Sequence, residues 1–324
     1  MAKMTLQVRD LCTSFFTDKG EIKAVNHVSF DVPKGSIIGI VGESGCGKSM
    51  TARSVMRLLK YPGKIVSGSI VLEDKELTTL TEMEMSNVRG EEISMIFQEP
   101  MTSLNPVMKV GKQVQEVVLL HRKVTKQEAK KEVIRIFEKV GISEPEKRYE
   151  CYPHELSGGL RQRVMIAMAM ICRPKLLIAD EPTTALDVTV EAQILELMKN
   201  LRDEIGTSII LISHNLGVVA ELCDYVHVMY AGRIVEQAET FELFDNPRHP
   251  YTIGLMNAVD SLEKKQAVLD TIPGTVPNLL NLPEGCSFAP RCGRRCEECG
   301  KSVPELHEVA PGHLVRCHVL GQEV

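Results

Sequence analysis

The sequence predicts an α/β fold whose parallel strands present ligand-binding residues at their carboxyl ends. Three short apolar runs support this prediction: Ile37–Val41, Leu176–Ala179 and Ile209–Ile212. Apolar runs of this length are typical of strands buried on both faces of a parallel sheet. Each run is followed at once by glycine or polar residues, and open α/β sheets bind ligands at that end of their strands. The three strand ends are therefore the first candidates for a functional site.

Length and composition limit the class of protein. The chain has 324 residues, enough for one large domain and a smaller appendage, and 44% hydrophobic and 25% charged residues are ordinary for a globular protein. The net charge of −5 comes without a basic stripe, which argues against a nucleic acid partner. No apolar run is long enough for a signal peptide or a membrane span, so we expect a cytoplasmic protein. Among the ten cysteines, those that cluster favour metal binding over disulfides in a reducing compartment.

The first strand end carries a phosphate-binding loop. The peptide GESGCGKS fits the pattern GxxxxGK[ST], and a helix is expected to begin near Lys48. Glycines permit positive φ angles, which allow successive amides to point at phosphate oxygens. Lys48 would contact the β and γ phosphates and the Ser49 hydroxyl would bind magnesium; the alternative is a glycine-rich turn that binds nothing. The residues predicted to contact ATP here are Gly42, Ser44, Gly45, Cys46, Gly47, Lys48, Ser49 and Met50.

Polar residues at the other strand ends suit ATP hydrolysis. Asp180 is placed to hold magnesium and Glu181 to polarise an attacking water, although an acidic pair could instead cap the next helix. His214 could orient the γ phosphate and the water. Gln98 follows the predicted strand Ile93–Phe97 and offers an oxygen to magnesium and an amide to water. The predicted catalytic residues are Glu181, His214, Gln98 and Lys48, and the predicted magnesium ligands are Ser49, Gln98 and Asp180.

The peptide LSGGLRQR, Leu156–Arg163, predicts a second anion site. Ser157 caps a helix start, and Gly158 and Gly159 expose backbone amides there. With this peptide the chain resembles the nucleotide-binding subunits of ATP-binding cassette (ABC) transporters over residues 4 to about 240.

That resemblance implies a fold and an assembly. The implied fold is a RecA-like core with an antiparallel β-subdomain and a helical subdomain at about residues 99–172. The implied assembly is a head-to-tail dimer that holds ATP between the phosphate loop of one subunit and the signature peptide of the other. An isolated subunit should then hydrolyse ATP poorly. The implied signature residues are Ser157, Gly158, Gly159 and Gln162, and the "ALD" loop Ala185–Asp187 contributes Asp187.

The resemblance also implies a contact with adenine, and the sequence itself predicts a contact with a membrane protein. An aromatic side chain near the first strand would stack on adenine; we favour Phe15 over Phe16, with ordinary core packing as the alternative. The segment after Gln98 opens a helical insertion of amphipathic character, suited to gripping a short helix of a membrane protein. Its candidate contact residues are Met101, Leu104 and Pro106, for which ordinary loop packing is the alternative.

The chain beyond about residue 240 resembles the carboxyl-terminal extension of dipeptide and oligopeptide importer ATPases, a branch that includes nickel importers. FELFDNPRHPYTIGLMNAV and the proline-rich TIPGTVPNLLNLPEG carry this resemblance. It implies domains at 1–240 and 241–324 and an ATP-hydrolysing motor for peptide import, closest to the dipeptide type, with nickel import as the alternative. The implied partners are a second, non-identical ATPase, two transmembrane permease subunits and, indirectly, an extracytoplasmic peptide-binding protein. The chain would then lie at the cytoplasmic face of the membrane.

The extension contains five cysteines at spacings that suit a metal. Spacing alone leaves open an iron–sulfur cluster, zinc with help from His307, His313 or His318, and uncoordinated thiols. The resemblance to the importer branch implies a 4Fe-4S cluster and leaves Cys296 without a role. Because the tail has few apolar residues, we expect metal coordination to fold it. The implied cluster ligands are Cys286, Cys292, Cys299 and Cys317.

A soluble cassette ATPase acting in translation or DNA repair is the competing class. The translation type normally carries two cassettes in one chain, and the repair type divides its cassette with a long coiled coil. This sequence has one phosphate loop and no heptad run, which favours the transporter class.

Overall fold

The computed structural model describes residues 3–98, 103–183, 187–263 and 272–320. The chain divides into two compact units, and each unit is assembled from separate stretches of sequence. The first unit comprises Met1–Leu6, Val32–Ser36 and Thr79–Ile210, and the second comprises Gln7–Asp31, Ile37–Thr78 and Leu211–Val324. The phosphate loop therefore belongs to the second unit, and the predicted acidic pair belongs to the first.

The second unit contains a run of paired strands in which the pairing changes from parallel to antiparallel. β3 (Ile37–Val41) pairs in parallel with β9 (Tyr225–Tyr230), and β9 pairs antiparallel with β10 (Arg233–Glu239). β10 then pairs with β12 (His313–Val315), which pairs with β11 (His307–Ala310). All five residues of β3 are buried, as expected for a strand covered on both faces. The helices of this unit are α1 (Lys48–Val55), α9 (Leu216–Leu222), α10 (Thr240–Asp245) and α11 (Pro250–Glu263).

A four-stranded sheet carries the predicted antiparallel β-subdomain. Its strand order is β2-β1-β4-β5, where the two longest strands are β1 (Met4–Thr17) and β2 (Gly20–Pro33). A tight turn at Asp18 and Lys19 joins them. The shorter strands are β4 (Gly63–Leu72) and β5 (Lys75–Glu76), which pair antiparallel.

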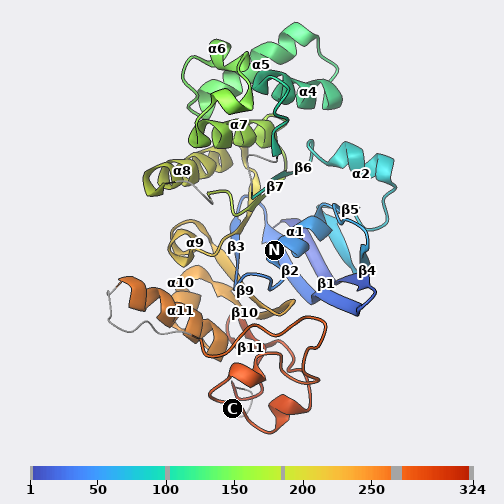
Figure 1. Cartoon of the computed structure of the whole chain (residues 1–324), viewed down its shortest axis with the longest axis vertical. Helices are drawn as coiled ribbons and strands as arrows, with labels where there is room; N and C mark the ends of the chain where they lie inside the picture. The colour runs from blue at the N-terminus through green and yellow to red at the C-terminus, as the bar shows by residue number, and fades with distance from the viewer. Residues whose placement is uncertain (1–2, 99–102, 184–186, 264–271, 321–324) are drawn as a thin grey trace. The chain divides into compact units, whose positions relative to one another are not determined.

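The first unit combines a parallel strand pair with a group of helices. β6 (Ile93–Ile96) pairs in parallel with β7 (Leu176–Asp180), and Ile96 lies opposite Ala179. Helices α4 to α7 lie together in this unit, drawn in green in Figure 1. The start of α5 is fixed by a capping box between Thr125 and Glu128. The helices are α2 (Glu82–Val88), α4 (Val110–His121), α5 (Lys126–Lys139), α6 (Pro145–Tyr149), α7 (Gly158–Met170) and α8 (Val188–Ile205).

The α/β class predicted from the sequence is confirmed. The apolar runs form β3, β6, β7 and β8 (Ser208–Ile212), and the predicted helix begins at Lys48. The division between the two units falls inside β8, after Ile210.

The extension is held by contacts with the strands of its own unit. β12 is hydrogen-bonded to β10, and the rings of Tyr230, Tyr251 and Phe288 pack with centroids 4.7–5.5 Å apart. The expectation that metal coordination folds this tail missed these contacts, because the apolar partners lie in the strands and in α11, outside the cysteine-rich segment. Two single 3₁₀ turns, Ala289–Arg291 and Glu298–Gly300, shape the cysteine-rich segment.

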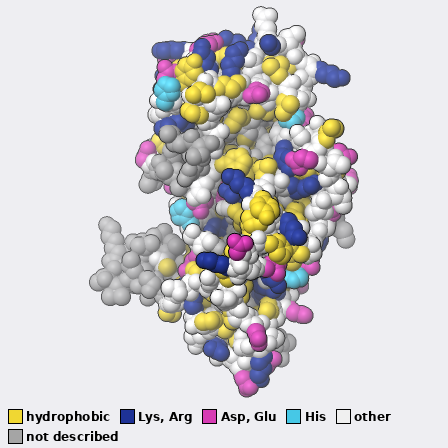
Figure 2. All heavy atoms as spheres, turned by 45° about the vertical axis from the view of Figure 1, so that its right-hand side comes forward, with side chains coloured by type: hydrophobic (Ala, Val, Ile, Leu, Met, Phe, Trp, Pro, Cys, Tyr) yellow, Lys and Arg dark blue, Asp and Glu magenta, His cyan; other side chains and the backbone are white. Residues whose placement is uncertain are grey.

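Charge is mixed on the surface. Figure 2 shows acidic and basic side chains interspersed over the face that it draws. Among the described residues, no helix is both long enough and apolar enough to cross a bilayer.

Candidate functional site

The phosphate loop in the second unit adopts a conformation that only its glycines permit. Gly42, Gly45 and Gly47 have φ angles of 147°, 78° and 110°, in the region that side chains with a Cβ rarely adopt. A Cβ on Gly47 would collide with the backbone oxygen of Ala24, and one on Gly42 would collide with that of Met229. Close backbone contacts therefore leave no room for a side chain at Gly42 or Gly47.

Lys48 begins α1 and is folded back into the loop. Its ammonium donates hydrogen bonds to the carbonyl oxygens of Gly42, at 2.7 Å, and Glu43, at 3.1 Å. Ser44 and Gly45 are exposed, whereas Cys46 is buried beneath the loop, and burial raises the pKa of its thiol. Lys48 is therefore positioned at the loop's inner side and the loop tip faces outward.

The remaining predicted loop residues, Ser49 and Met50, lie in the first turn of α1 and are half-buried. The amino end of a helix carries partial positive charge, which favours an anion at the loop that precedes it.

The first unit brings Gln98 and Glu181 together. The amide of Gln98 donates a hydrogen bond of 2.8 Å to a carboxylate oxygen of Glu181. Parallel pairing of β6 with β7 explains this meeting, because both residues follow paired strands at the same edge. Asp180 ends β7 and is buried, and Glu181 has a φ of 49°. A non-glycine residue in this region is strained by about 1–3 kcal/mol, and such strain is concentrated at functional sites.

The signature peptide forms the amino end of α7. Ser157 is exposed and its hydroxyl accepts a hydrogen bond from the amide of Leu160 at 3.3 Å, so it caps the helix as predicted. Gly158 and Gly159 occupy the first turn and are half-buried. Gln162 differs from these three, because it is buried and donates to the carbonyl oxygen of Pro182 in its own unit.

The other predicted nucleotide residues occupy element ends. Asp187 caps α8 by accepting a hydrogen bond from the amide of Val190 at 2.9 Å, while Ala185 and Leu186 lie outside the described residues. His214 follows β8 and is exposed.

Of the two phenylalanines, Phe15 is the more buried. Its ring packs on Gly63, whereas Phe16 is 44% exposed and lies 4.6 Å beneath the ammonium of Lys64.

The residues predicted to contact a partner in the helical region differ in exposure. Met101 lies outside the described residues. Leu104 is buried, whereas Pro106 is exposed. Val107, which the sequence analysis did not select, is 82% exposed.

The metal-bound extension expected from the sequence is not supported by the structure. Among the described residues, no three or more His, Cys, Asp or Glu side chains are arranged to hold a metal ion. The sulfur of Cys299 lies 3.4 Å from that of Cys296, the cysteine left without a role. Burial raises the pKa of Cys299 to about 11, and burial also raises the pKa of Cys286. Among the described residues, the four implied ligands are therefore not assembled as a metal site.

The histidines considered for zinc have partners elsewhere. His313 lies between two carboxylates, with Nε2 at 2.7 Å from Glu236 and Nδ1 at 3.1 Å from Glu242. His318 is 2.9 Å from the carbonyl oxygen of Ser302, and His307 lies in β11. His313 therefore joins the extension to β10.

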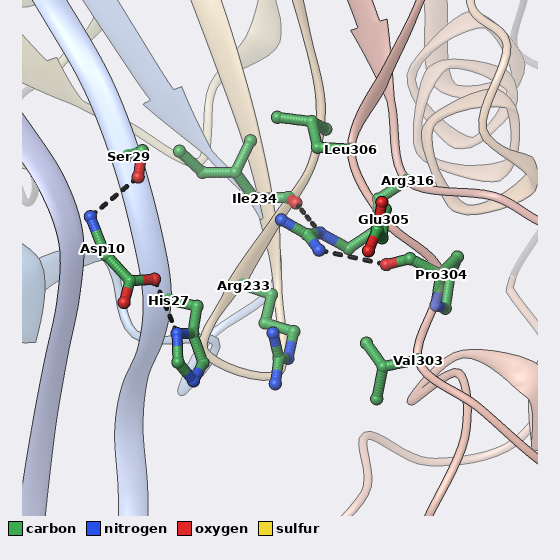
Figure 3. A pocket seen from close by; sticks show the side chains of 10 residues that line it. All are labelled: Asp10, His27, Ser29, Arg233, Ile234, Val303, Pro304, Glu305, Leu306 and Arg316. Carbon is green, nitrogen blue, oxygen red and sulfur yellow. Dashed lines mark hydrogen bonds and ion pairs between the residues drawn. The ribbon is translucent and has the colours of Figure 1, made fainter.

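A charged hollow lies where the extension meets the strands of the second unit. It has a volume of about 420 Å³, and Figure 3 shows Asp10, His27 and Arg233 on one side of it and residues of the extension on the other. Asp10 pairs with His27 at 2.6 Å, and Arg316 donates to two backbone carbonyl oxygens. Two arginines and two acidic residues line this hollow, and none of them is a predicted nucleotide residue.

One contact of the phosphate loop was missed by the sequence analysis. Glu43 pairs with Arg291 of the extension at 2.7 Å. No local signal could have shown it, because 248 positions separate the two residues.

A phosphate loop, an acidic pair at a strand end and a serine-capped glycine pair define the chain as a nucleoside triphosphatase of the cassette type. The ABC transporter family matches residues 25–184, and the family described as the carboxyl-terminal region of oligopeptide/dipeptide transporters matches residues 235–299.

Curated relatives extend the match over nearly the whole chain. The oligopeptide transport ATP-binding protein OppD of Salmonella typhimurium is 52% identical over 98% of this chain and 94% of that protein. The dipeptide transport ATP-binding protein DppD of Bacillus subtilis is 49% identical over 98% of this chain and 95% of that protein. The dimeric cassette MJ0796, a bacterial ABC transporter cassette, shares the fold with a TM-score of 0.66 and 23% identity, over 72% of this chain and 98% of that one.

The chain belongs to the ABC transporter family, as an ATP-binding subunit of the oligopeptide/dipeptide class. It is an ATPase, and membership of this family implies transmembrane permease partners.

Proposed function

We propose that this chain is the ATP-hydrolysing motor of a peptide importer. The observation that carries the proposal is identity of about 50% with oligopeptide and dipeptide transport ATP-binding proteins over nearly the full chain, including the carboxyl-terminal region. The permease subunits would carry the peptide across the membrane, while this chain closes and opens with ATP. We infer that the substrate is a dipeptide or a short oligopeptide; nickel import remains the second candidate, on the sequence resemblance alone.

We propose roles for the site residues that follow from their chemistry. Lys48 and the loop amides bind the phosphates, and Glu181 acts as general base toward water, oriented by Gln98 and assisted by His214. The hydrogen bond from Gln98 to Glu181 supports this pairing of roles. Ser49, Asp180 and Gln98 offer the oxygen donors that magnesium prefers, and magnesium would neutralise charge on the phosphates. Phe15 stacks on adenine.

We propose that the signature peptide acts on ATP held by a partner subunit. Exposed Ser157 and the glycines after it, at the start of α7, support this role, and Asp187, which is also exposed, would take part in it. The inward bond of Gln162 suggests that it supports the turn from behind. The partner is a second, non-identical ATPase, and the pair docks on the cytoplasmic face of the membrane through the helical region at about 99–172. The cassette would comprise residues 1–240 and the extension residues 241–324.

A 4Fe-4S cluster on the extension stays a proposal, with zinc as its alternative. It is supported by four cysteines in one segment, where the charges that Cys317 and Cys292 can carry act on Cys286. The sulfur atoms would have to converge from their present positions. Iron and acid-labile sulfide in anaerobically purified protein would support the cluster, and a colourless, zinc-containing protein would refute it.

A Glu181→Gln variant tests the motor function. Removing the general base should lower ATP turnover by about 10²–10⁴-fold and leave ATP binding intact, so that ATP traps paired subunits. Size-exclusion chromatography with ATP and magnesium would detect the pair, and purification from membranes would identify the integral proteins that accompany it. Recovery of ribosomes or DNA, or full turnover by a strictly monomeric preparation, would contradict the proposal.

A further inference from the structure

Residue 43 of the phosphate loop is held by the extension. Glu43 lies between Gly42 and Ser44, and its carboxylate accepts two hydrogen bonds from Arg291, at 2.7 Å from Nη1 and 3.1 Å from Nη2. Its backbone amide donates to the hydroxyl of Tyr251 in α11 at 2.8 Å. A bidentate arginine–carboxylate pair fixes orientation as well as distance. Both the side chain and the backbone of this loop residue are therefore fixed by residues of the extension.

Arg291 is itself rigidly built into the extension. Its Nε donates to the carbonyl oxygen of Pro273 at 2.8 Å, and its guanidinium lies 5.9 Å from the ring centres of Tyr230 and Phe288. The side chain of Arg291 is 5% exposed and that of Glu43 is 27% exposed. A buried guanidinium with these contacts is pre-organised to meet one carboxylate, and the pair is shielded from solvent far better than a surface salt bridge.

The cysteine-rich turn presents Arg291 to the loop. Arg291 ends the 3₁₀ turn Ala289–Arg291, which stands between Cys286 and Cys292. The amide of Ala289 donates to the carbonyl oxygen of Cys286 at 3.0 Å, and the amide of Cys286 donates to that of Cys299 at 2.9 Å. The conformation of the cysteine segment thus decides where the guanidinium lies.

The carboxylate of Glu43 is a problem for a loop that binds phosphates. Lys48 donates to the carbonyl oxygen of the same residue, so Glu43 is close to the ammonium that should meet the nucleotide. An uncompensated negative charge there would repel the phosphates and compete for Lys48. At the effective dielectric of a protein surface, like charges at such close range repel strongly enough to weaken binding. Arg291 removes this repulsion by neutralising the carboxylate and turning it toward the extension.

We propose that Arg291 is a positioning residue for ATP binding. Through Arg291, the cysteine-rich extension contributes to the nucleotide site. The proposal rests on the proposed function in that the phosphate loop must bind ATP. It gives the extension a role whether or not the cysteines hold a metal.

ATP affinity of the full chain tests the proposal. Arg291→Met keeps an unbranched apolar stem and removes the charged guanidinium, and it should weaken ATP binding by about tenfold in equilibrium binding with magnesium and low salt. Adding Glu43→Gln to Arg291→Met should restore most of the affinity, because the uncompensated charge is gone. The defect of the single variant should shrink at 1 M salt, since screening weakens the repulsion. A merely structural role of Arg291 would produce neither the rescue nor the salt effect.

Two further variants separate the possible outcomes. Arg295→Met removes an exposed arginine of the same segment and should bind ATP as tightly as the natural chain. Lys48→Ala should abolish binding, and if it does not, the proposed nucleotide site is wrong whatever Arg291 does. If Lys48→Ala abolishes binding while Arg291→Met binds normally, the further inference alone is overturned. A loss in Arg291→Met that Glu43→Gln does not relieve would also overturn it.

Discussion

The phosphate loop and the cysteine-rich extension differ in how much of their conformation is set by local contacts. The loop takes its shape from its own glycines, and its lysine bonds to carbonyl oxygens five and six positions away. The extension is fixed by distant residues: β12 pairs with β10, His313 pairs with Glu236, and Arg291 reaches Glu43. Local contacts require particular residues at fixed spacings in the sequence, which can be recognised, whereas contacts between distant residues produce no such pattern.

This difference shows which kinds of sequence motif predict a three-dimensional arrangement. Glycines at fixed spacing specify backbone angles directly, so the motif in the sequence predicts the geometry of the loop. Five cysteines in one segment specify only which residues could bind a metal. Whether their sulfurs converge depends on the turns between them and on the partners that bury each one. In this structure Arg291, which stands among the cysteines, pairs with Glu43 in the phosphate loop.

The largest effect is expected from a single methyl group in the loop. Gly47→Ala places a Cβ against the backbone oxygen of Ala24 at a φ of 110°, so the loop must shift. A shift of about 1 Å in a catalytic constellation can reduce the rate about a hundredfold. We expect a loss of about that size in ATP hydrolysis by the assembled transporter.

The matched control for this variant is Gly35→Ala. Gly35 also has a positive φ, 73°, but a Cβ there would meet nothing within 4 Å. It shares the backbone strain without the collision, so we expect a small loss of stability and nearly normal hydrolysis. Equal defects in the two variants would show that the loop does not depend on close packing.

A smaller effect, on stability, is expected at the junction of the extension. The buried carboxylate of Glu236 accepts bonds from the amides of Arg248 and His249 as well as pairing with His313. Glu236→Ala leaves these groups buried without an acceptor and should cost about 3–5 kcal/mol. Urea denaturation followed by circular dichroism measures the loss.

Glu242→Ala is the comparison for that variant. Glu242 contacts the same histidine at 3.1 Å, but its side chain is 34% exposed. We expect a loss below about 1 kcal/mol, since solvent compensates an exposed pair. If the two variants lose the same stability, burial is not what makes this junction strong.

The sequence could predict the strands, the loop and the acidic pair because each is encoded by neighbouring residues. Leu176–Ala179 is apolar throughout and is buried throughout as β7, and Ser157 caps α7 where a serine before two glycines should. The hydrogen bond between Gln98 and Glu181 follows once β6 and β7 are paired.

The rest of the site could not be predicted, for physical reasons that differ between residues. Leu104 is predicted to contact a partner, yet it is buried, because burial within its own chain also removes an apolar side chain from water. Arg291 looked like one of several arginines near the cysteines. Only the three-dimensional fold distinguishes it from exposed Arg294 and Arg295.

The smallest effect is a pH dependence of the same junction. Burial alone would lower the pKa of His313, but its contacts with Glu236 and Glu242 outweigh burial and raise the pKa above the ordinary value of 6.5. The folded chain therefore holds this proton more tightly than the unfolded chain. The stabilisation is complete below pH 6.5 and is lost as pH rises through the raised pKa.

The comparison with His313→Gln isolates this contribution. His227 and His249 act in the opposite direction, because burial lowers the pKa of each to about 4 and protonation below pH 6.5 then favours unfolding. The difference in unfolding free energy between the natural chain and His313→Gln cancels them, and it should shrink as pH rises from 6 toward 9. A difference that stays constant over this range would show that His313 is neutral when it pairs with Glu236, and the junction would then depend on hydrogen bonds alone.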